Sequence, residues 1–282
     1  MRLRMTELKP MIPAISCGLG IGQKGISMSS AFPLSELPAQ TTIDVWLIEL
    51  DRPLSFGANL DDVLSIQERD RAARFAFERD ALRFRLCRAM LRLGLGWYLQ
   101  RSPRDIELAT GAWGKPFLTD GSELRFNVTH SDGLGLIAFT TAGEVGIDIE
   151  SLDRAVDAVD IASTYFAKGE MAMIAAGVTP QEQVSIFLRL WTRKEAVLKA
   201  AGYGIARGLD TVDMSQSRGS GLGLSGNQST ISGTGWVVKD LEPINGFVGA
   251  VAAPPGDWSI QQWWIRYEDA LDRIVGKFPG TI

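Results

Sequence analysis

Two long helical stretches, each accompanied by short apolar runs, constrain the fold of this chain more than any other feature. The first spans about residues 65–99, and the second begins at Thr179 and ends near Gly202. A strand-like run at 43–48 precedes the first stretch, and five short runs follow it before residue 151. Three more runs follow the second stretch, around 235–238, 247–251 and 259–265. This order predicts an α+β fold whose two halves share one rhythm, although no repeat is visible in the sequence.

The second helical stretch has clear start and stop signals. Thr179 with Glu182 three residues later forms a T-x-x-E capping box, and Pro180 stands in the first turn, where its missing N–H costs little. Gly202 offers a left-handed residue that ends the helix. We therefore predict a helix of about six turns in this region.

The division of the chain follows from these elements. Residues 1–41 are rich in Gly, Ser and Pro and are expected to form a loosely ordered extension. Residues 42–142 are expected to form a first α+β unit and residues 143–256 a second one. Residues 257–282 are expected to complete the second half, and the Gly-rich stretch 215–234 to form a flexible hairpin loop.

Composition excludes several classes of protein. The 282 residues are 45% hydrophobic and include eight Trp and twelve Phe, so the chain cannot be largely disordered. A net charge of −4 argues against a general nucleic-acid binder. Two cysteines, Cys17 and Cys87, cannot build a disulfide framework. No apolar run reaches the ~18 residues of a membrane span, and the N-terminus lacks a clear signal peptide. We expect a cytoplasmic protein that binds neither membranes nor nucleic acid.

A pair of carboxylates marks the segment Val145–Glu150, which reads V-G-I-D-I-E. On a strand, Ile147 and Ile149 point to one face, and Asp148 and Glu150 point to the other, with Cβ atoms roughly 7 Å apart. Two carboxylates at this distance repel unless a cation lies between them. Mg²⁺ is the natural resident, because it prefers oxygen ligands. The alternative is an ordinary solvent-exposed strand end.

A third acidic residue lies on the second long helix. Trp191, Glu195 and Lys199 are spaced by four residues and therefore share one face. In the simplest interpretation, Glu195 and Lys199 form a surface ion pair worth a few tenths of a kcal/mol. If this face meets the strand of Asp148 and Glu150, a third carboxylate completes a Mg²⁺ site and a lysine stands ready for phosphate oxygens.

Basic residues elsewhere suit phosphate, although each also has an ordinary explanation. His130 is the one histidine of the chain, and a lone histidine is commonly a structural hydrogen-bonding group. The neighbouring Ser131 is no sign of a hydrolase triad, because no G-x-S-x-G elbow exists. Lys115 lies in a predicted turn. The first helical stretch carries many arginines, whose guanidinium groups bind phosphate in a bidentate manner: Arg69, Arg71, Arg74, Arg79, Arg83, Arg85, Arg88 and Arg92.

Together these motifs resemble the Sfp-type 4′-phosphopantetheinyl transferases, in the branch whose last motif reads W-x-x-K-E-A. The matches run in family order. Gly114-Lys115-Pro116 is similar to the G-K-P motif, Phe126–Ser131 is similar to F-N-x-S-H-S, and Val145–Glu150 is similar to G-[IV]-D-[IV]-E. Phe166–Glu170 is similar to F-x-x-x-E, and Trp191–Lys199 is similar to W-x-x-K-E-A-x-x-K. The arginines between Arg74 and Arg88 also fit. The resemblance covers about residues 42–252, and Thr129 replaces the usual Ser but keeps the hydroxyl.

The resemblance implies a fold of two similar α+β halves related by a pseudo-twofold axis, each a small sheet packed on a long helix. It implies a monomeric enzyme that moves the 4′-phosphopantetheine arm of coenzyme A to a serine of an apo acyl or peptidyl carrier protein, releasing adenosine 3′,5′-bisphosphate. Asp148, Glu150 and Glu195 would hold Mg²⁺. Asp148, Glu195 and Lys199 would be catalytic, with Glu195 taking the serine proton. The residues expected to bind coenzyme A are Arg74, Arg83, Arg88, Lys115, His130 and Ser131.

Two other functions use the same residues. A Mg²⁺-dependent phosphohydrolase of a nucleotide pyrophosphate would use water as the nucleophile and would cleave coenzyme A without a carrier protein. A non-catalytic module that binds carrier proteins would keep its binding after loss of the carboxylates. The intact W-x-x-K-E-A-x-x-K helix favours the transferase.

Overall fold

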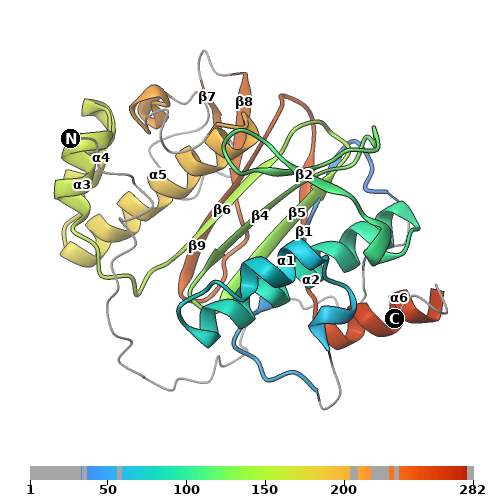
Figure 1. The fold of residues 1–282 in the computed structure, drawn as a ribbon. Helices are drawn as coiled ribbons and strands as arrows, with labels where there is room; N and C mark the ends of the chain where they lie inside the picture. The colour runs from blue at the N-terminus through green and yellow to red at the C-terminus, as the bar shows by residue number, and fades with distance from the viewer. Residues whose placement is uncertain are drawn as a thin grey trace.

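Two four-stranded sheets lie at the centre of the protein in this computed structural model (Figure 1). The structure describes residues 33, 37–55, 59–203, 209–216, 229–231 and 235–277. The first sheet consists, in order, of β10 (Ser259–Trp264), β1 (Thr42–Glu49), β5 (Leu134–Thr140) and β4 (Arg125–Ser131). The second consists of β6 (Gly146–Ser151), β9 (Phe247–Ala253), β8 (Trp236–Asp240) and β7 (Ser229–Ile231). A separate hairpin contains β2 (Leu108–Thr110) and β3 (Pro116–Leu118).

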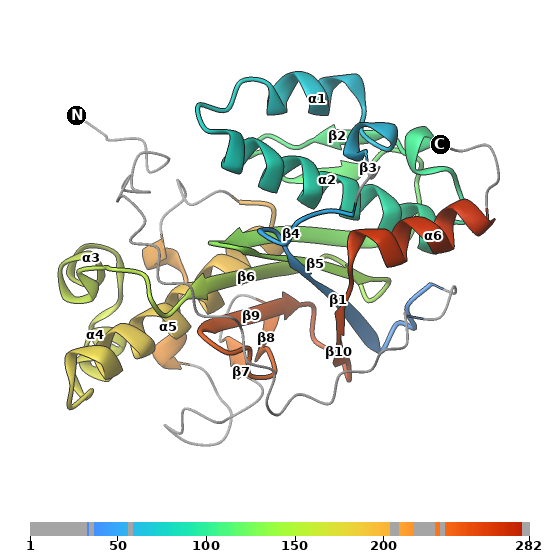
Figure 2. The ribbon, with the colours of Figure 1, turned by 90° about the horizontal axis from the view of Figure 1, so that it is seen from below.

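Helices cover the two four-stranded sheets on both sides. They are α1 (Ile66–Ala72), α2 (Glu78–Leu99), α3 (Ala158–Tyr165), α4 (Lys168–Ala175), α5 (Pro180–Ala200) and α6 (Tyr267–Lys277). Short 3₁₀ turns lie at Leu60–Asp62, Pro103–Asp105, Leu209–Thr211 and Met214–Gln216. The two four-stranded sheets lie between α1, α2 and α6 on one side and α3, α4 and α5 on the other (Figure 2). The predicted α+β class is confirmed, and the pseudo-twofold relation of the halves stays a prediction.

Strand β1 explains how the core is organised. Trp46 and Ile48 belong to the core that packs against α2, whereas Ile43, Val45 and Leu47 belong to the core that also contains residues of β6 and β9. Successive side chains of a strand point to opposite faces, so a strand buried on both faces must be apolar at nearly every position. The first apolar run of the sequence is therefore a central strand.

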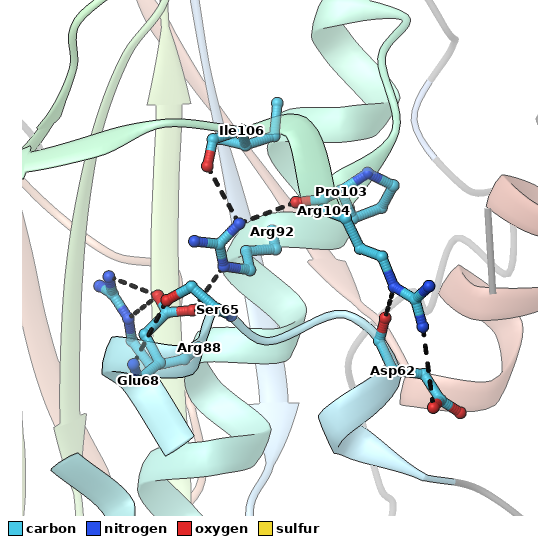
Figure 3. Close-up of polar contacts among 8 residues, drawn as sticks. All are labelled: Asp62, Ser65, Glu68, Arg88, Arg92, Pro103, Arg104 and Ile106. Carbon is cyan, nitrogen blue, oxygen red and sulfur yellow. Dashed lines mark hydrogen bonds and ion pairs between the residues drawn. The ribbon is translucent and has the colours of Figure 1, made fainter. Parts of the chain in front are cut away.

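The helix predicted over residues 65–99 is wrong as a single element. α1 ends at Ala72, the chain turns, and α2 begins at Glu78. Two long-range ion pairs hold the folded-back arrangement: Glu68 binds Arg88 and Arg92, which follow it by 20 and 24 residues (Figure 3). On a continuous helix these partners would lie about 30 Å or more apart. The chain folds back, and α1 packs on α2.

The assignment of residues 257–282 to the second half is also wrong. β10 pairs in parallel with β1, with Trp263 beside Trp46, and so extends the first sheet. Ala270 and Ile274 of α6 are buried in the core of the first half. Strands more than 200 residues apart leave no local signal of their pairing, and sequence proximity pointed to the wrong partner.

The helix predicted from the capping box at Thr179 is confirmed as α5. The Thr179 hydroxyl accepts a hydrogen bond from the backbone N–H of Glu182, and the Glu182 carboxylate accepts one from the N–H of Thr179. Most of the expected extension, residues 1–32 and 34–36 with Cys17, lies outside the described residues, as do 217–228 and 232–234 of the expected loop. None of the described helices combines the length and apolarity that crossing a bilayer requires.

Candidate active site

The two sheets meet where edge strand β4 runs beside edge strand β6 (Figure 1). The side chain of Thr129 on β4 donates a hydrogen bond to Oδ1 of Asp148 at 3.0 Å, and that of Ser131 donates to Oε2 of Glu150 at 3.0 Å. Both carboxylates of the V-G-I-D-I-E segment therefore lie at the junction of the two halves.

The predicted facing of β6 is confirmed. Ile147 and Ile149 are buried in the core between the sheets. Gly146, Asp148 and Glu150 share the opposite face, as alternation along a strand requires. On this face lies α5, so close that a Cβ atom added at Gly146 would come within 1.9 Å of a backbone carbonyl oxygen of the helix. The glycine of the motif therefore lets the helix approach the strand directly.

Lys199 of α5 reaches across this close contact. Its Nζ lies 2.6 Å from Oδ1 of Asp148, 3.1 Å from the carbonyl oxygen of Ile147 and 3.2 Å from the hydroxyl of Thr129. Burial alone would lower the pKa of this lysine, but the charges of Asp148, Glu195 and Glu150 outweigh burial and raise the pKa. The ammonium group therefore stays protonated beside the carboxylates.

The helix face of Glu195 and Lys199 does meet the acidic strand. Glu195 is only 5% exposed. Trp191, one turn earlier, stacks on Phe166 and packs at a tilt against Phe187 in the core of the second half. The alternative of a solvated Glu–Lys surface pair does not hold, because Lys199 is paired with β6 and Glu195 is buried. The fold thus pairs Lys199 with Asp148 and places its ammonium group within the electrostatic influence of Glu195 and Glu150.

The electrostatics of this group favour an additional cation. Burial, and then the charge of Asp148, raise the pKa of Glu150, even though Arg154 donates a hydrogen bond to Glu150 at 2.7 Å. Oδ2 of Asp148 is buried and has no hydrogen-bond partner among the described residues. An all-oxygen set with a buried, unused carboxylate oxygen fits Mg²⁺. The described residues hold no ready-made cluster of three His, Cys, Asp or Glu ligands.

The residues predicted to bind phosphate are placed differently from one another. Arg74 and His130 are exposed. Lys115 lies at the junction, with Nζ 2.8 Å from Oε2 of Glu144 and 3.0 Å from the carbonyl oxygen of Val145. Exposed and junction-facing basic side chains of this kind are suited to an anionic ligand.

Two of the predicted arginines are engaged in ion pairs within the first half. Arg83 binds Asp51 through two hydrogen bonds, and this contact lowers the pKa of the Asp51 carboxyl group. Arg88 binds Glu68, which also binds Arg92 (Figure 3). The charge of Arg88 therefore serves to hold α1 against α2.

Comparisons with known proteins agree with this architecture. A family model described as the 4′-phosphopantetheinyl transferase superfamily matches residues 144–252, and one described as 4′-phosphopantetheinyl transferase, N-terminal, matches residues 58–142. The chain is 34% identical over 224 residues to the 4′-phosphopantetheinyl transferase HetI of Nostoc sp., covering 78% of this chain and 91% of HetI. The chain belongs to the 4′-phosphopantetheinyl transferase superfamily.

Two further relatives are also similar to this phosphopantetheinyl transferase. The Sfp protein of Bacillus subtilis, named a 4′-phosphopantetheinyl transferase, is 29% identical over 231 residues, or 80% of this chain and 99% of Sfp. A Synechocystis sp. protein named a putative 4′-phosphopantetheinyl transferase is 35% identical over 170 residues, or 60% of this chain and 68% of its own. The two family models adjoin at residue 143, between β5 and β6, so residues of both matched parts build the site.

Sequence reasoning missed the contacts of Asn127 and Thr129 with β6, and it missed a buried ion pair in the second half. Asn127 and Thr129 alternate with Ser131 along β4, and the sequence motif alone assigns neither of them a role. Lys194 is completely buried and binds Glu170, which is also completely buried. The spacing of two along β4 was a usable signal, whereas the partner of Lys194 lies 24 residues away and could not be read locally.

Proposed function

We propose that this enzyme transfers the 4′-phosphopantetheine arm of coenzyme A to a serine hydroxyl of an apo carrier protein and releases adenosine 3′,5′-bisphosphate. The observation that carries the proposal is the convergence of Asp148, Glu150, Glu195 and Lys199 at the junction of the halves. Buried carboxylates beside a protonated lysine suit the handling of a pyrophosphate. The names of the relatives support the same reaction.

Each residue of the site has a task in this reaction. Asp148, Glu150 and Glu195 would hold Mg²⁺, which when bound neutralises pyrophosphate charge. Glu195, directly or through a water molecule, accepts the proton of the serine hydroxyl. The serine oxygen bonds to the phosphorus that carries the pantetheine arm, and the bond from that phosphorus to the leaving nucleotide breaks. Lys199 stabilises the charge that develops on the phosphate oxygens.

Basic side chains of the first half bind the nucleotide end of coenzyme A. We assign this task to Arg74, Arg83, Lys115 and His130, with phosphate replacing Asp51 at Arg83 and Glu144 at Lys115. Arg guanidinium groups bind phosphate in a bidentate manner, as Arg83 binds a carboxylate here.

Arg88 and Ser131, which were expected to bind coenzyme A, act in our proposal through other residues. Arg88 holds α1 by binding Glu68, and Ser131 holds the side chain of Glu150. Neither needs to touch the nucleotide.

A mass measurement tests the reaction and separates it from its alternatives. The full chain is incubated with coenzyme A, Mg²⁺ and a panel of apo carrier proteins. We expect at least one carrier protein to gain the mass of one phosphopantetheine arm. A phosphohydrolase would instead consume coenzyme A in a tube without carrier protein, and a binding module would co-elute with a carrier protein whose mass does not change.

We further propose that the enzyme works in the cytoplasm as a monomer and binds neither membranes nor nucleic acid. The net charge of −4 supports the last point, because nucleic-acid binding relies on basic surfaces. Light scattering of the purified chain, alone and with DNA, tests the oligomeric state and the absence of DNA binding.

A further inference from the structure

Three alternate residues of β4, Asn127, Thr129 and Ser131, form hydrogen bonds to β6 through their side chains. The backbone N–H of Ile147 donates to Oδ1 of Asn127 at 2.9 Å. The Thr129 hydroxyl donates to Oδ1 of Asp148 at 3.0 Å. The Ser131 hydroxyl donates to Oε2 of Glu150 at 3.0 Å and accepts from the N–H of Ser151 at 3.1 Å. We call these three β4 residues the side-chain ladder.

We propose that the side-chain ladder positions the carboxylates of β6, so that Asn127, Thr129 and Ser131 are positioning residues for the Mg²⁺ ligands. This inference rests on the proposed function, because the carboxylates matter only if they bind the metal. Groups that hydrogen-bond to metal ligands fix their orientation, and losing one typically weakens metal affinity about 10–100-fold.

The position of β6 depends on Asn127, the first residue of the side-chain ladder. β6 pairs with β9 along its other edge, so the buried N–H of Ile147 needs a partner on the β4 side. Asn127, itself only 4% exposed, supplies that partner. Because a strand cannot slip past a buried side-chain acceptor without losing it, this bond sets the height of Asp148 relative to the first half.

The orientation of Asp148 depends on Thr129, the second residue of the side-chain ladder. Thr129 and Lys199 both bind Oδ1, and the hydroxyl of Thr129 also accepts a hydrogen bond from Lys199. Oδ2 of Asp148 is the oxygen left over for a cation. Removing the Thr129 hydroxyl would take away one of the two hydrogen bonds that hold Oδ1 and would free the carboxylate to rotate about its contact with Lys199.

Thr129 offers the sharpest test, because Val matches its shape and lacks the hydroxyl. Mg²⁺ binding to the metal-free full chain is measured by isothermal titration calorimetry for the wild type, Thr129→Val and Thr129→Ser. We expect Thr129→Val to raise the Kd for Mg²⁺ about 10–100-fold. We expect Thr129→Ser to restore most of the affinity, because it restores the hydroxyl.

Thr140→Val is the matched control. Thr140 is a fully buried threonine on the neighbouring strand β5, and its hydroxyl donates to the carbonyl oxygen of Thr42, away from the carboxylates. We expect this control to lower the unfolding temperature without changing the Kd for Mg²⁺. Ser131→Ala, at a half-buried position, provides a second test of weaker Mg²⁺ binding if Thr129→Val does not fold.

The outcomes separate this inference from the proposed function. An unchanged Kd in both Thr129→Val and Ser131→Ala would overturn the ladder, as would an equal loss in Thr140→Val or a wild type that binds no Mg²⁺. If the Kd values change as expected but the wild type modifies no carrier protein, the ladder stands and the proposed transfer fails.

Discussion

Replacing Gly146 by Ala tests whether the close contact between β6 and α5 builds the site. The new Cβ would lie 1.9 Å from the carbonyl oxygen of Ala196 and 2.4 Å from the amide nitrogen of Ala200, whereas real Cβ atoms keep at least 3.0 Å from such atoms. Both neighbours are backbone atoms, so the helix itself must retreat by about 1 Å. Glu195 and Lys199 would move with it.

Two magnitudes follow from that displacement. Inserting a methyl group into a packed interior typically costs about 1–3 kcal/mol of the free energy of unfolding. A misplacement of about 1 Å at a reacting centre can cost about 10²-fold in rate. We therefore expect Gly146→Ala to lower stability by about 1–3 kcal/mol and to lower kcat about 10²-fold under conditions where the variant is fully folded.

The assay combines urea unfolding followed by circular dichroism with the rate of carrier-protein modification measured by mass spectrometry. Gly276→Ala in α6 is the control, because a Cβ added at Gly276 meets no atom within 4 Å and α6 packs in the core of the first half. We expect this control to keep the wild-type rate. A Gly146→Ala protein with wild-type stability and wild-type kcat would refute the argument that contact between the backbones of β6 and α5 sets the geometry.

Three further changes have expected results. Lys194→Met leaves Glu170 buried without its cation and should cost about 3–5 kcal/mol in urea unfolding, with the double variant Lys194→Met/Glu170→Met recovering part of the loss. Burial would raise the pKa of Glu68, but the charges of Arg88 and Arg92 outweigh burial and lower it. The ionised Glu68 therefore stabilises the folded protein above about pH 4.3, and this contribution is lost as the pH falls. Glu68→Gln should flatten the acid side of a curve of unfolding free energy against pH. His130→Ala should raise the KM for coenzyme A more than it lowers kcat in steady-state kinetics.

The local part of the fold could be predicted from the sequence. The capping box at Thr179 defines the start of α5 because both of its hydrogen bonds connect residues three apart. The facing of Asp148 and Glu150 could be predicted for a similar reason, since alternation along a strand needs no knowledge of the rest of the chain. In patterns of this kind, the residues that interact lie within a few positions of one another, so the sequence alone is enough to predict them.

The long-range part could not be predicted from patterns of that kind. The break between α1 and α2 depends on Glu68 meeting Arg88, and the place of β10 depends on its pairing with β1 across the whole chain. The roles of Thr129 and Ser131 appear only when β4 and β6 lie side by side. The family resemblance indicated which residues converge, but not that Arg88 would be engaged with Glu68.

The most direct test of the central claim is the kcat of Glu195→Gln with saturating coenzyme A, apo carrier protein and Mg²⁺. The amide keeps the size of the side chain but loses its charge and its ability to accept a proton. Glu182→Gln serves as the control, because Glu182 caps the start of the same helix. If the carboxylates of β6 and α5 perform the transfer, Glu195→Gln should lower kcat by at least about 10²–10⁴-fold while Glu182→Gln keeps the wild-type kcat. A Glu195→Gln enzyme with the wild-type kcat would contradict the account, because the buried carboxylate would then take no part in the reaction.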